Sequence, residues 1–188
     1  MKVFELQGSV RSELGKKAAK AFRREGVIPC ELYGQGQNVH FTCNESDLRK
    51  LVYTHEIFEV ALTIDGKATK AIIQEIQFHP ISDRILHMDF LEINETEPIV
   101  MQVPVRLEGL AEGVKAGGKL SLDMRKLKIK ALVKDMPEKL IINVENLGLG
   151  KVMQVKNLQF EGLQIMTTPN AVVCSVKMTR GAKAAAEA

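Results

Sequence analysis

The chain has no tryptophan, and none of its apolar runs approaches the roughly 20 residues that a membrane-spanning helix requires. Its three cysteines, Cys30, Cys43 and Cys174, are an odd number without CxxC spacing, and the start of the chain lacks the pattern of a secretory signal. These absences argue against a membrane span and against a disulfide framework. We therefore expect a soluble protein of the reducing cytoplasm.

The composition of the 188 residues is typical of a folded globular protein, with 45% hydrophobic and 26% charged side chains. This length allows a substantial core in one or two domains. The net charge of +3 is too small to indicate nucleic acid by itself, but the charges are unevenly distributed. Residues 1–95 hold 12 basic and 14 acidic side chains, whereas residues 96–188 hold 14 and 9.

A concentrated basic segment, residues 11–24, lies in the more acidic half and contains Glu13 as its only acid. Its basic residues are Arg11, Lys16, Lys17, Lys20, Arg23 and Arg24. On a helix, the last five fall within about a third of the circumference, while Leu14, Ala18, Ala21 and Phe22 take the opposite side. This pattern predicts a helix that packs with one face and meets phosphates with the other. The alternative is an ordinary solvated helix face.

A polar, acidic stretch that ends in Pro98 separates two groups of predicted strands, so we place a domain boundary there. The predicted domains are residues 1–95 and 96–178. Residues 179–188 lack large apolar side chains and are expected to form a disordered tail.

The first domain is predicted to be mainly β, with short helices and glycine-containing turns. Its strands are expected at residues 3–10, 28–33, 39–43, 58–64, 67–78 and 85–93. The basic helix is expected to end at Gly26, and Ser46 to cap a short second helix. Successive strands are expected to be antiparallel and to close into a barrel, because closure removes free edges.

The second domain is also predicted to be all β. Its strands are expected at residues 99–107, 127–133, 140–144 and 172–178, which are alternating or rich in β-branched residues. A sandwich or an open barrel is the expected architecture.

Residues 76–90 predict a hairpin with one polar face. Strand alternation places Leu86, Met88 and Phe90 on the side away from that face. The polar side chains expected to converge are Gln77, His79, His87 and Asp89.

Tyr33 ends an earlier strand, where its ring can pack while its hydroxyl stays exposed. RNA-binding surfaces combine aromatic rings, cations and fixed polar groups, and all three occur here. The alternatives are an ordinary solvent face and a tyrosine at the edge of the core.

Three other chemistries are weaker alternatives. Cys30 or Cys43 with His87 and Asp89 would supply a nucleophile, base and orienting acid by residue type alone. The histidines and Asp89 with a cysteine would supply metal ligands, but without the spacing of a zinc site. Residues 113–120 nearly match a phosphate-binding loop, yet Leu120 replaces the required hydroxyl and a strand pattern follows. A glycine turn between strands is the preferred interpretation of this segment.

With these segments in place, the chain resembles the bacterial large-subunit ribosomal protein family that binds 5S rRNA, in its long two-domain form, the general stress protein Ctc type. The segments that carry the resemblance in the first domain are Gly15-Lys16-Lys17-Ala18 with Arg23-Arg24, Pro29 to Gly34, Gln77-Phe78-His79-Pro80 and His87-Met88-Asp89-Phe90. Those in the second are Val103-Pro104-Val105-Arg106 and Glu112 to Gly118.

The resemblance implies a noncatalytic N-terminal β-barrel that sits on an irregular region of 5S rRNA in the cytoplasmic ribosome. It implies phosphate contacts from the basic segment, a sugar-phosphate contact from Tyr33, and minor-groove contacts from the hairpin. The expected RNA-binding residues are Arg11, Lys16, Lys17, Lys20, Arg23, Arg24, Tyr33, Gln77, His79, His87 and Asp89. No cofactor, metal, membrane or small-molecule substrate is expected.

A competing hypothesis assigns the main role to residues 96–188. In that case the chain is a protein-interaction module or a stress-related factor, and its basic second half contacts an acidic partner or neighbouring ribosomal proteins. The basic helix would then be merely solvated.

Overall fold

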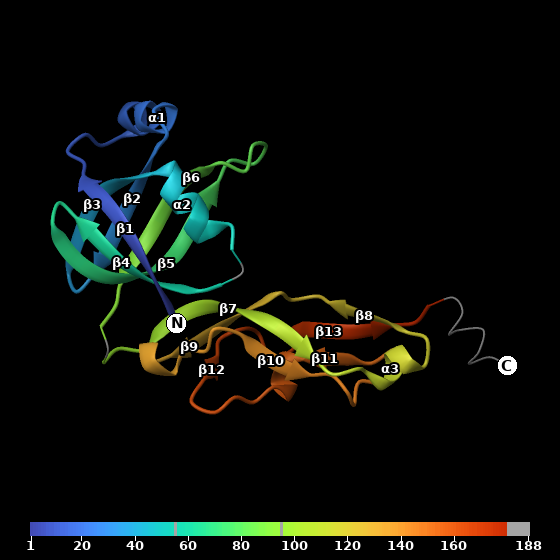
Figure 1. Ribbon diagram of the computed structural model, residues 1–188. Coiled ribbons are helices and arrows are strands. Elements are labelled where there is room, and N and C mark those ends of the chain that lie inside the picture. The colour runs from blue at the N-terminus through green and yellow to red at the C-terminus, as the bar shows by residue number, and fades with distance from the viewer. Residues whose placement is uncertain (55, 95, 180–188) are drawn as a thin grey trace. The chain divides into compact units, whose positions relative to one another are not determined.

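The structure, a computed structural model, describes residues 1–54, 56–94 and 96–179, and the chain divides into two units, Met1–Glu97 and Pro98–Ala188 (Figure 1). The predicted tail therefore lies outside the described residues, except for Thr179, whose hydroxyl donates to the Gly117 carbonyl at 2.7 Å. None of the described helices is long and apolar enough to cross a membrane.

Alternating apolar and polar residues build six strands in the first unit, and these close into a barrel as predicted. They are β1 (Lys2–Val10), β2 (Val27–Gly34), β3 (Gln37–Asn44), β4 (Phe58–Ile64), β5 (Lys67–Phe78) and β6 (Ile85–Glu92). Around the barrel the order is β1-β3-β2-β6-β5-β4, and β4 returns to β1.

The expectation that successive strands would all be antiparallel is wrong for this barrel. β1 pairs in parallel with β4, and β2 pairs in parallel with β6. The other four neighbouring pairs are antiparallel. Parallel neighbours need a crossover connection, and helices provide part of it here, because one follows β1 and another follows β3.

The barrel interior holds the first unit's core. On β6 the buried positions are Ile85, Met88 and Phe90, each exposed by 1% or less. The Phe90 ring lies 5.7 Å from the ring of Phe41 on β3, centroid to centroid. Because alternate residues of a strand point to opposite faces, this buried set leaves His87 and Asp89 on the outside.

The basic helix α1 (Lys16–Arg24) packs against β2 through a face that differs from the predicted one. Ala18, Ala19 and Phe22 are half-buried, whereas Ala21 is exposed and Leu14 is 56% exposed. Leu14 cannot join the helical face because the chain turns at Gly15, where φ is 99°. The contact face is therefore rotated toward Ala19.

The second helix of this unit, α2 (Glu45–Val52), buries Leu48 and Leu51 against the barrel core. It begins one residue before Ser46, and its cap position is Asn44, so the predicted cap was misplaced. The Glu45 amide instead donates to the Gly26 carbonyl at 2.9 Å, which links the start of α2 to the turn that follows α1.

The described part of the second unit, residues 98–179, is all β apart from one short α-helix and two 3-10 turns, as its sequence pattern predicted. One sheet has the order β10-β7-β9-β12, formed by β10 (Leu140–Asn143), β7 (Ile99–Glu108), β9 (Lys126–Ala131) and β12 (Gln164–Ile165). The other has the order β11-β13-β8, formed by β11 (Val152–Gln154), β13 (Val172–Lys177) and β8 (Lys119–Leu122). The helical segments are α3 (Glu112–Lys115), η1 (Val133–Asp135) and η2 (Val155–Asn157).

The three short strands β8, β11 and β12 were not predicted. β11 and β12 have only three and two residues, which are too few to show a clear alternation. The predicted strand at residues 127–133 ends earlier, since β9 stops at Ala131 and the chain enters η1.

Candidate nucleic-acid interface

The outer wall of the barrel brings together polar residues from three neighbouring strands. Gln77 on β5 lies opposite His87 on β6, as the predicted hairpin requires. The Nδ1 atom of His87 is 2.7 Å from Oδ1 of Asp89, and their side chains are 19% and 27% exposed. The sheet and the contact between His87 and Asp89 therefore fix the positions of these side chains, which remain accessible to solvent.

Two further carboxylates, which the sequence analysis did not select, lie beside Asp89. Glu75 on β5 and Glu31 on β2 are its register partners on either side. The bulge between Ile73 and Glu75 turns Glu75 to the outer face. Alternation along β2 indicates that Glu31 faces outward, because Cys30 and Leu32 are buried. The side-chain amide of Asn38 donates to Glu31.

Tyr33 is half-buried on the outer side of β2, beside this acidic row. Burial raises the pKa of its hydroxyl, and the negative charges of Asp89, Glu31 and Glu75 raise it further. The protonated hydroxyl can donate a hydrogen bond.

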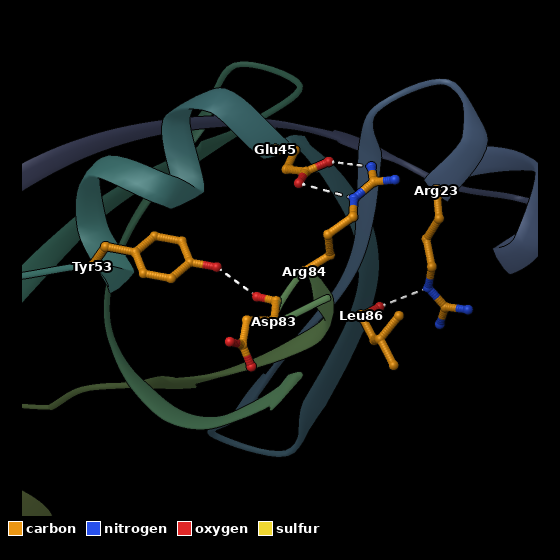
Figure 2. Close-up of polar contacts among 6 residues, drawn as sticks. All are labelled: Arg23, Glu45, Tyr53, Asp83, Arg84 and Leu86. Atoms are coloured by element: carbon orange, nitrogen blue, oxygen red, sulfur yellow. Dashed lines mark hydrogen bonds and ion pairs between the residues drawn. The ribbon is translucent and has the colours of Figure 1, made fainter. Parts of the chain in front are cut away.

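A bulge at the start of β6 connects this wall to the basic helix. Ile85 pairs with Phe78 and His87 pairs with Gln77, so Leu86 is the extra residue. It was predicted to point into the core with Met88, but Ile85 takes the interior position instead. Arg23 Nε donates to the Leu86 carbonyl at 2.8 Å, which places the end of α1 beside β6 (Figure 2).

The turn between β5 and β6 contains His79, because β5 ends at Phe78. His79 therefore begins the turn and does not continue the row of polar strand residues. Its Nδ1 atom lies 3.1 Å from the Ser82 hydroxyl and 3.3 Å from the Ser82 amide nitrogen. The ring thus stabilises the turn through one of its nitrogens.

Two contacts from the ends of helix α2 also hold the turn between β5 and β6 (Figure 2). The Tyr53 hydroxyl donates to the Asp83 carbonyl at 2.6 Å, where Asp83 has a left-handed φ of 52°. Arg84 makes a bidentate contact to Glu45, at 2.6 Å through Nη2 and 3.3 Å through Nε. The hydrogen bond from Arg84 lowers the pKa of the Glu45 carboxyl.

The cations of residues 11–24 differ in exposure. Those with exposed side chains are Lys16, Lys17, Lys20 and Arg24. Arg23 is half-buried by its contact to β6, and Arg11 is half-buried beside β3. The Arg11 amide donates to the His40 carbonyl at 3.1 Å, while its Nε atom is shielded from solvent without a hydrogen-bond partner among the described residues.

The alternative of a cysteine nucleophile is incompatible with the barrel. Cys30 and Cys43 are 0% and 2% exposed in the interior, whereas His87 and Asp89 lie on the outer wall. A hydrogen bond with the Cys43 side chain raises the pKa of the Cys30 thiol, as does its burial. An inward-facing thiol with a raised pKa is a poor nucleophile. Among the described residues, no three His, Cys, Asp or Glu side chains are grouped to hold a metal ion.

The segment that resembled a phosphate-binding loop is a tightly packed turn, as preferred above. The helix α3 comes before the pair Gly117-Gly118, and the strand β8 follows that pair. A Cβ atom on Gly113 would lie 2.6 Å from the backbone of Gly148, and one on Gly118 would lie 2.6 Å from the Gly113 carbonyl oxygen. These glycines allow close backbone packing.

The fold and this surface define a two-unit β protein whose first unit is a closed barrel with a cationic helix beside a polar wall. Residues 6–90 match the family model described as the Ribosomal L25p family. Residues 98–180 match that of the ribosomal protein TL5 C-terminal domain.

Curated relatives named large ribosomal subunit protein bL25 match over nearly the whole chain. The relative from Porphyromonas gingivalis is 57% identical over 188 residues, which cover 99% of this chain and 98% of the relative. That from Bacteroides thetaiotaomicron is 55% identical over 193 residues, covering 100% and 98%. That from Parabacteroides distasonis is 57% identical over 190 residues, covering 98% of each.

The chain therefore belongs to the ribosomal L25p family, in its long two-domain form. Membership makes it a ribosomal protein and not an enzyme, as the resemblance implied, and it is ribosome-associated in the cytoplasm.

Proposed function

We propose that the chain is a structural component of the large ribosomal subunit and that its first unit binds 5S rRNA. The observation that carries this proposal is the hydrogen bond from Arg23 to the Leu86 carbonyl. It ties the cationic helix to the strand that bears His87 and Asp89, so cations and fixed polar groups share one flank of the barrel. The names of the relatives support the large subunit as the place of binding.

In this proposal the basic segment contacts the phosphates of the RNA backbone. The exposed cations of α1 are free to follow a phosphate chain, and such contacts position a protein without reading sequence. Arg23 retains its terminal nitrogens for a phosphate while Nε holds the helix in place. The phosphate-binding residues are Arg11, Lys16, Lys20, Arg23 and Arg24, and Lys17 adds to the positive charge of the same RNA-binding segment.

The outer face of the barrel that carries Tyr33, Gln77, His87 and Asp89, which we call the polar wall, supplies the contacts that recognise the RNA. Tyr33 contacts the sugar-phosphate edge, and Gln77 and His87 contact groups in a widened minor groove. Asp89 is the most selective of these residues, because a carboxylate accepts from a guanine amino or imino group and repels phosphate. His87 occupies Oδ1 of Asp89, so we assign Oδ2 to the base. His79 contributes Nε2, since its Nδ1 faces Ser82.

The salt dependence of binding tests the phosphate contacts. If about five phosphates are neutralised, the logarithm of the affinity falls with the logarithm of the salt concentration at a slope near −4. The measurement is a titration of 5S rRNA at several salt concentrations. A flat response contradicts the proposed contacts.

Single substitutions distinguish the residues that recognise RNA bases from those that contact only the phosphate backbone. We expect Asp89→Ala and His87→Ala each to weaken binding to 5S rRNA by about 1 to 3 kcal/mol while changing binding to a random RNA duplex little. The matched control is Lys20→Ala, which is expected to weaken both RNAs similarly. Thermal unfolding verifies that each variant is folded. Equal losses on both RNAs for Asp89→Ala contradict its reading role.

A further inference from the structure

The solvent face of the four-stranded sheet in the second unit carries a row of lysines. Along β9, Leu127 and Ile129 are fully buried. The intervening residues Lys126, Lys128 and Lys130 therefore project from the opposite face. Successive lysines are about 6.7 Å apart along the strand, since each strand residue advances about 3.3 to 3.4 Å.

The neighbouring strands extend this cationic face, which we call the lysine face. On β7, the register partners of the lysines are the uncharged residues Val100, Gln102 and Pro104. Arg106 is exposed further along β7, where Ile141 of β10 lies opposite. On the other side, Gln164 of β12 pairs with Lys130.

The charges of this face are not neutralised within the unit. Among the described residues, none of the three lysines nor Arg106 lies within ion-pair distance of a carboxylate. The one acid of the β7 outer face is Glu108, at the far end of the strand opposite Asn143. The lysine face thus presents four uncompensated positive charges.

The composition of the face favours RNA over protein as its partner. Protein interfaces are enriched in aromatic residues and depleted in lysine. This face has lysines in its middle and no aromatic side chain among the strand positions named above. Phosphate backbones, in contrast, are bound by Lys and Arg without a shaped apolar pocket.

We propose that the lysine face binds the sugar-phosphate backbone of ribosomal RNA. This inference goes beyond the function proposed for the first unit, because it concerns different residues in a separate unit. It also assigns the excess positive charge of the second half to a defined surface.

The test measures how the full chain binds large ribosomal subunits from which this protein has been removed. The triple variant Lys126→Ala, Lys128→Ala, Lys130→Ala should make the slope of log affinity against log salt less negative by about 2 to 3, because three phosphate contacts are lost. A control triple variant, Lys119→Ala, Lys151→Ala, Lys156→Ala, removes the same charge from exposed positions outside the four-stranded sheet and should leave the slope unchanged. Equal slopes for both triple variants overturn the proposal.

A second measurement separates RNA from an acidic protein partner. In the wild-type protein bound to large subunits, Lys126, Lys128 and Lys130 should be protected from an amine-acetylating reagent, and ribonuclease treatment should restore their reactivity. Protection that survives ribonuclease identifies a protein partner and overturns the proposal, as does full reactivity in the bound state. The preference for 5S rRNA over a random duplex, and its loss in Asp89→Ala, report on the first unit independently, so the two proposals fail separately.

Discussion

Arg23 and Arg24 are adjacent in sequence and identical in charge, but the fold gives them different surroundings. Arg23 is half-buried and donates from Nε to the Leu86 carbonyl, while Arg24 is exposed. A hydrogen bond from a charged group to a carbonyl contributes more to stability than a neutral one. We infer that Arg23 fixes the orientation of α1 as well as contributing charge.

Exchanging each arginine for alanine separates these two roles. We expect Arg23→Ala to lower the free energy of local opening of α1 by about 1 kcal/mol, because the side-chain hydrogen bond from α1 to the bulge is lost. Native-state hydrogen exchange of the α1 amides would then accelerate about fivefold, since 1.4 kcal/mol corresponds to a factor of ten. Arg24→Ala is the matched control and should leave these exchange rates unchanged. Equal acceleration in both variants would contradict a positioning role for Arg23.

Glycine at position 118 is required for packing in the second unit. A Cβ atom there would approach the Gly113 carbonyl oxygen and the side chains of Leu149 and Val176, each at 2.6 Å. We expect Gly118→Ala to lower the free energy of unfolding of this unit by about 1 to 3 kcal/mol, because overpacked positions displace their neighbours. Denaturant unfolding measures the change. Gly148→Ala is the control, since its Cβ would meet only Lys151 Cγ at 3.7 Å; a comparable loss there would contradict the packing explanation.

At the scale of elements, the turn between β5 and β6 is held by helix α2 through a charge pair that depends on pH. Glu45 receives a bidentate contact from Arg84, which lowers the pKa of its carboxyl below the ordinary value of 4.5. A carboxyl whose pKa is lower in the folded state stabilises the fold above the pKa of the unfolded state. That contribution is lost as the pH falls through the folded-state pKa.

Replacing Glu45 with Gln is therefore expected to destabilise the first unit at neutral pH and to have little effect in acid. Because Arg84 is 54% exposed, solvent screening keeps the loss at pH 7 small. The measurement is urea unfolding of wild type and variant at a series of pH values from 7 to 3. Arg84→Gln should give the same profile, since it removes the other partner. If the free energy of unfolding of the variant differs from that of wild type by the same amount at every pH from 7 to 3, the ion pair is not the cause of the difference.

Local sequence patterns predicted where the strands of the barrel lie along the chain, but they did not predict which strands pair with each other. Alternation along β6 and β5 was sufficient to place His87, Asp89 and Gln77 on one face. The parallel pairing of β1 with β4 depends on contacts between residues more than 50 positions apart, and no local pattern records it. The bulge at Leu86 was also unpredictable, because one extra residue leaves the apolar sequence looking regular. As a result the bond from Arg23, which joins helix and wall, could not be derived from the sequence.

For the same reason the candidate site was predicted incompletely. Glu31 and Glu75 flank Asp89 only because β2 and β5 lie on either side of β6. Alternation in each strand marks these residues as outward-facing, but the order of strands is needed to bring them together. His79 was grouped with the strand residues because its spacing from Gln77 fits a strand, yet the strand ends before it.

On the scale of the whole molecule, the division into two units separates two kinds of charge arrangement. In the first unit the cations of α1 lie beside a wall of carboxylates, so positive and negative groups are closely mixed. In the second unit the lysine face has only Glu108 at its margin. Mixed charge suits discrimination between RNAs, because misplaced phosphates are repelled, whereas uniform positive charge binds phosphate without selection.

This division predicts what each unit does alone. The barrel has its own closed sheet and its own core, so residues 1–97 are expected to fold independently. We expect this fragment to bind 5S rRNA within about threefold of the full chain and to prefer it to a random RNA duplex, since the reading residues all lie in the barrel. Residues 98–188 should bind both RNAs equally and weakly, with steep salt dependence. The measurement is a direct titration of each fragment with each RNA, and the fragment 1–97 carrying Asp89→Ala serves as the control that loses the preference. If the preference for 5S rRNA were instead found only in residues 98–188, the barrel wall would not be the reading surface.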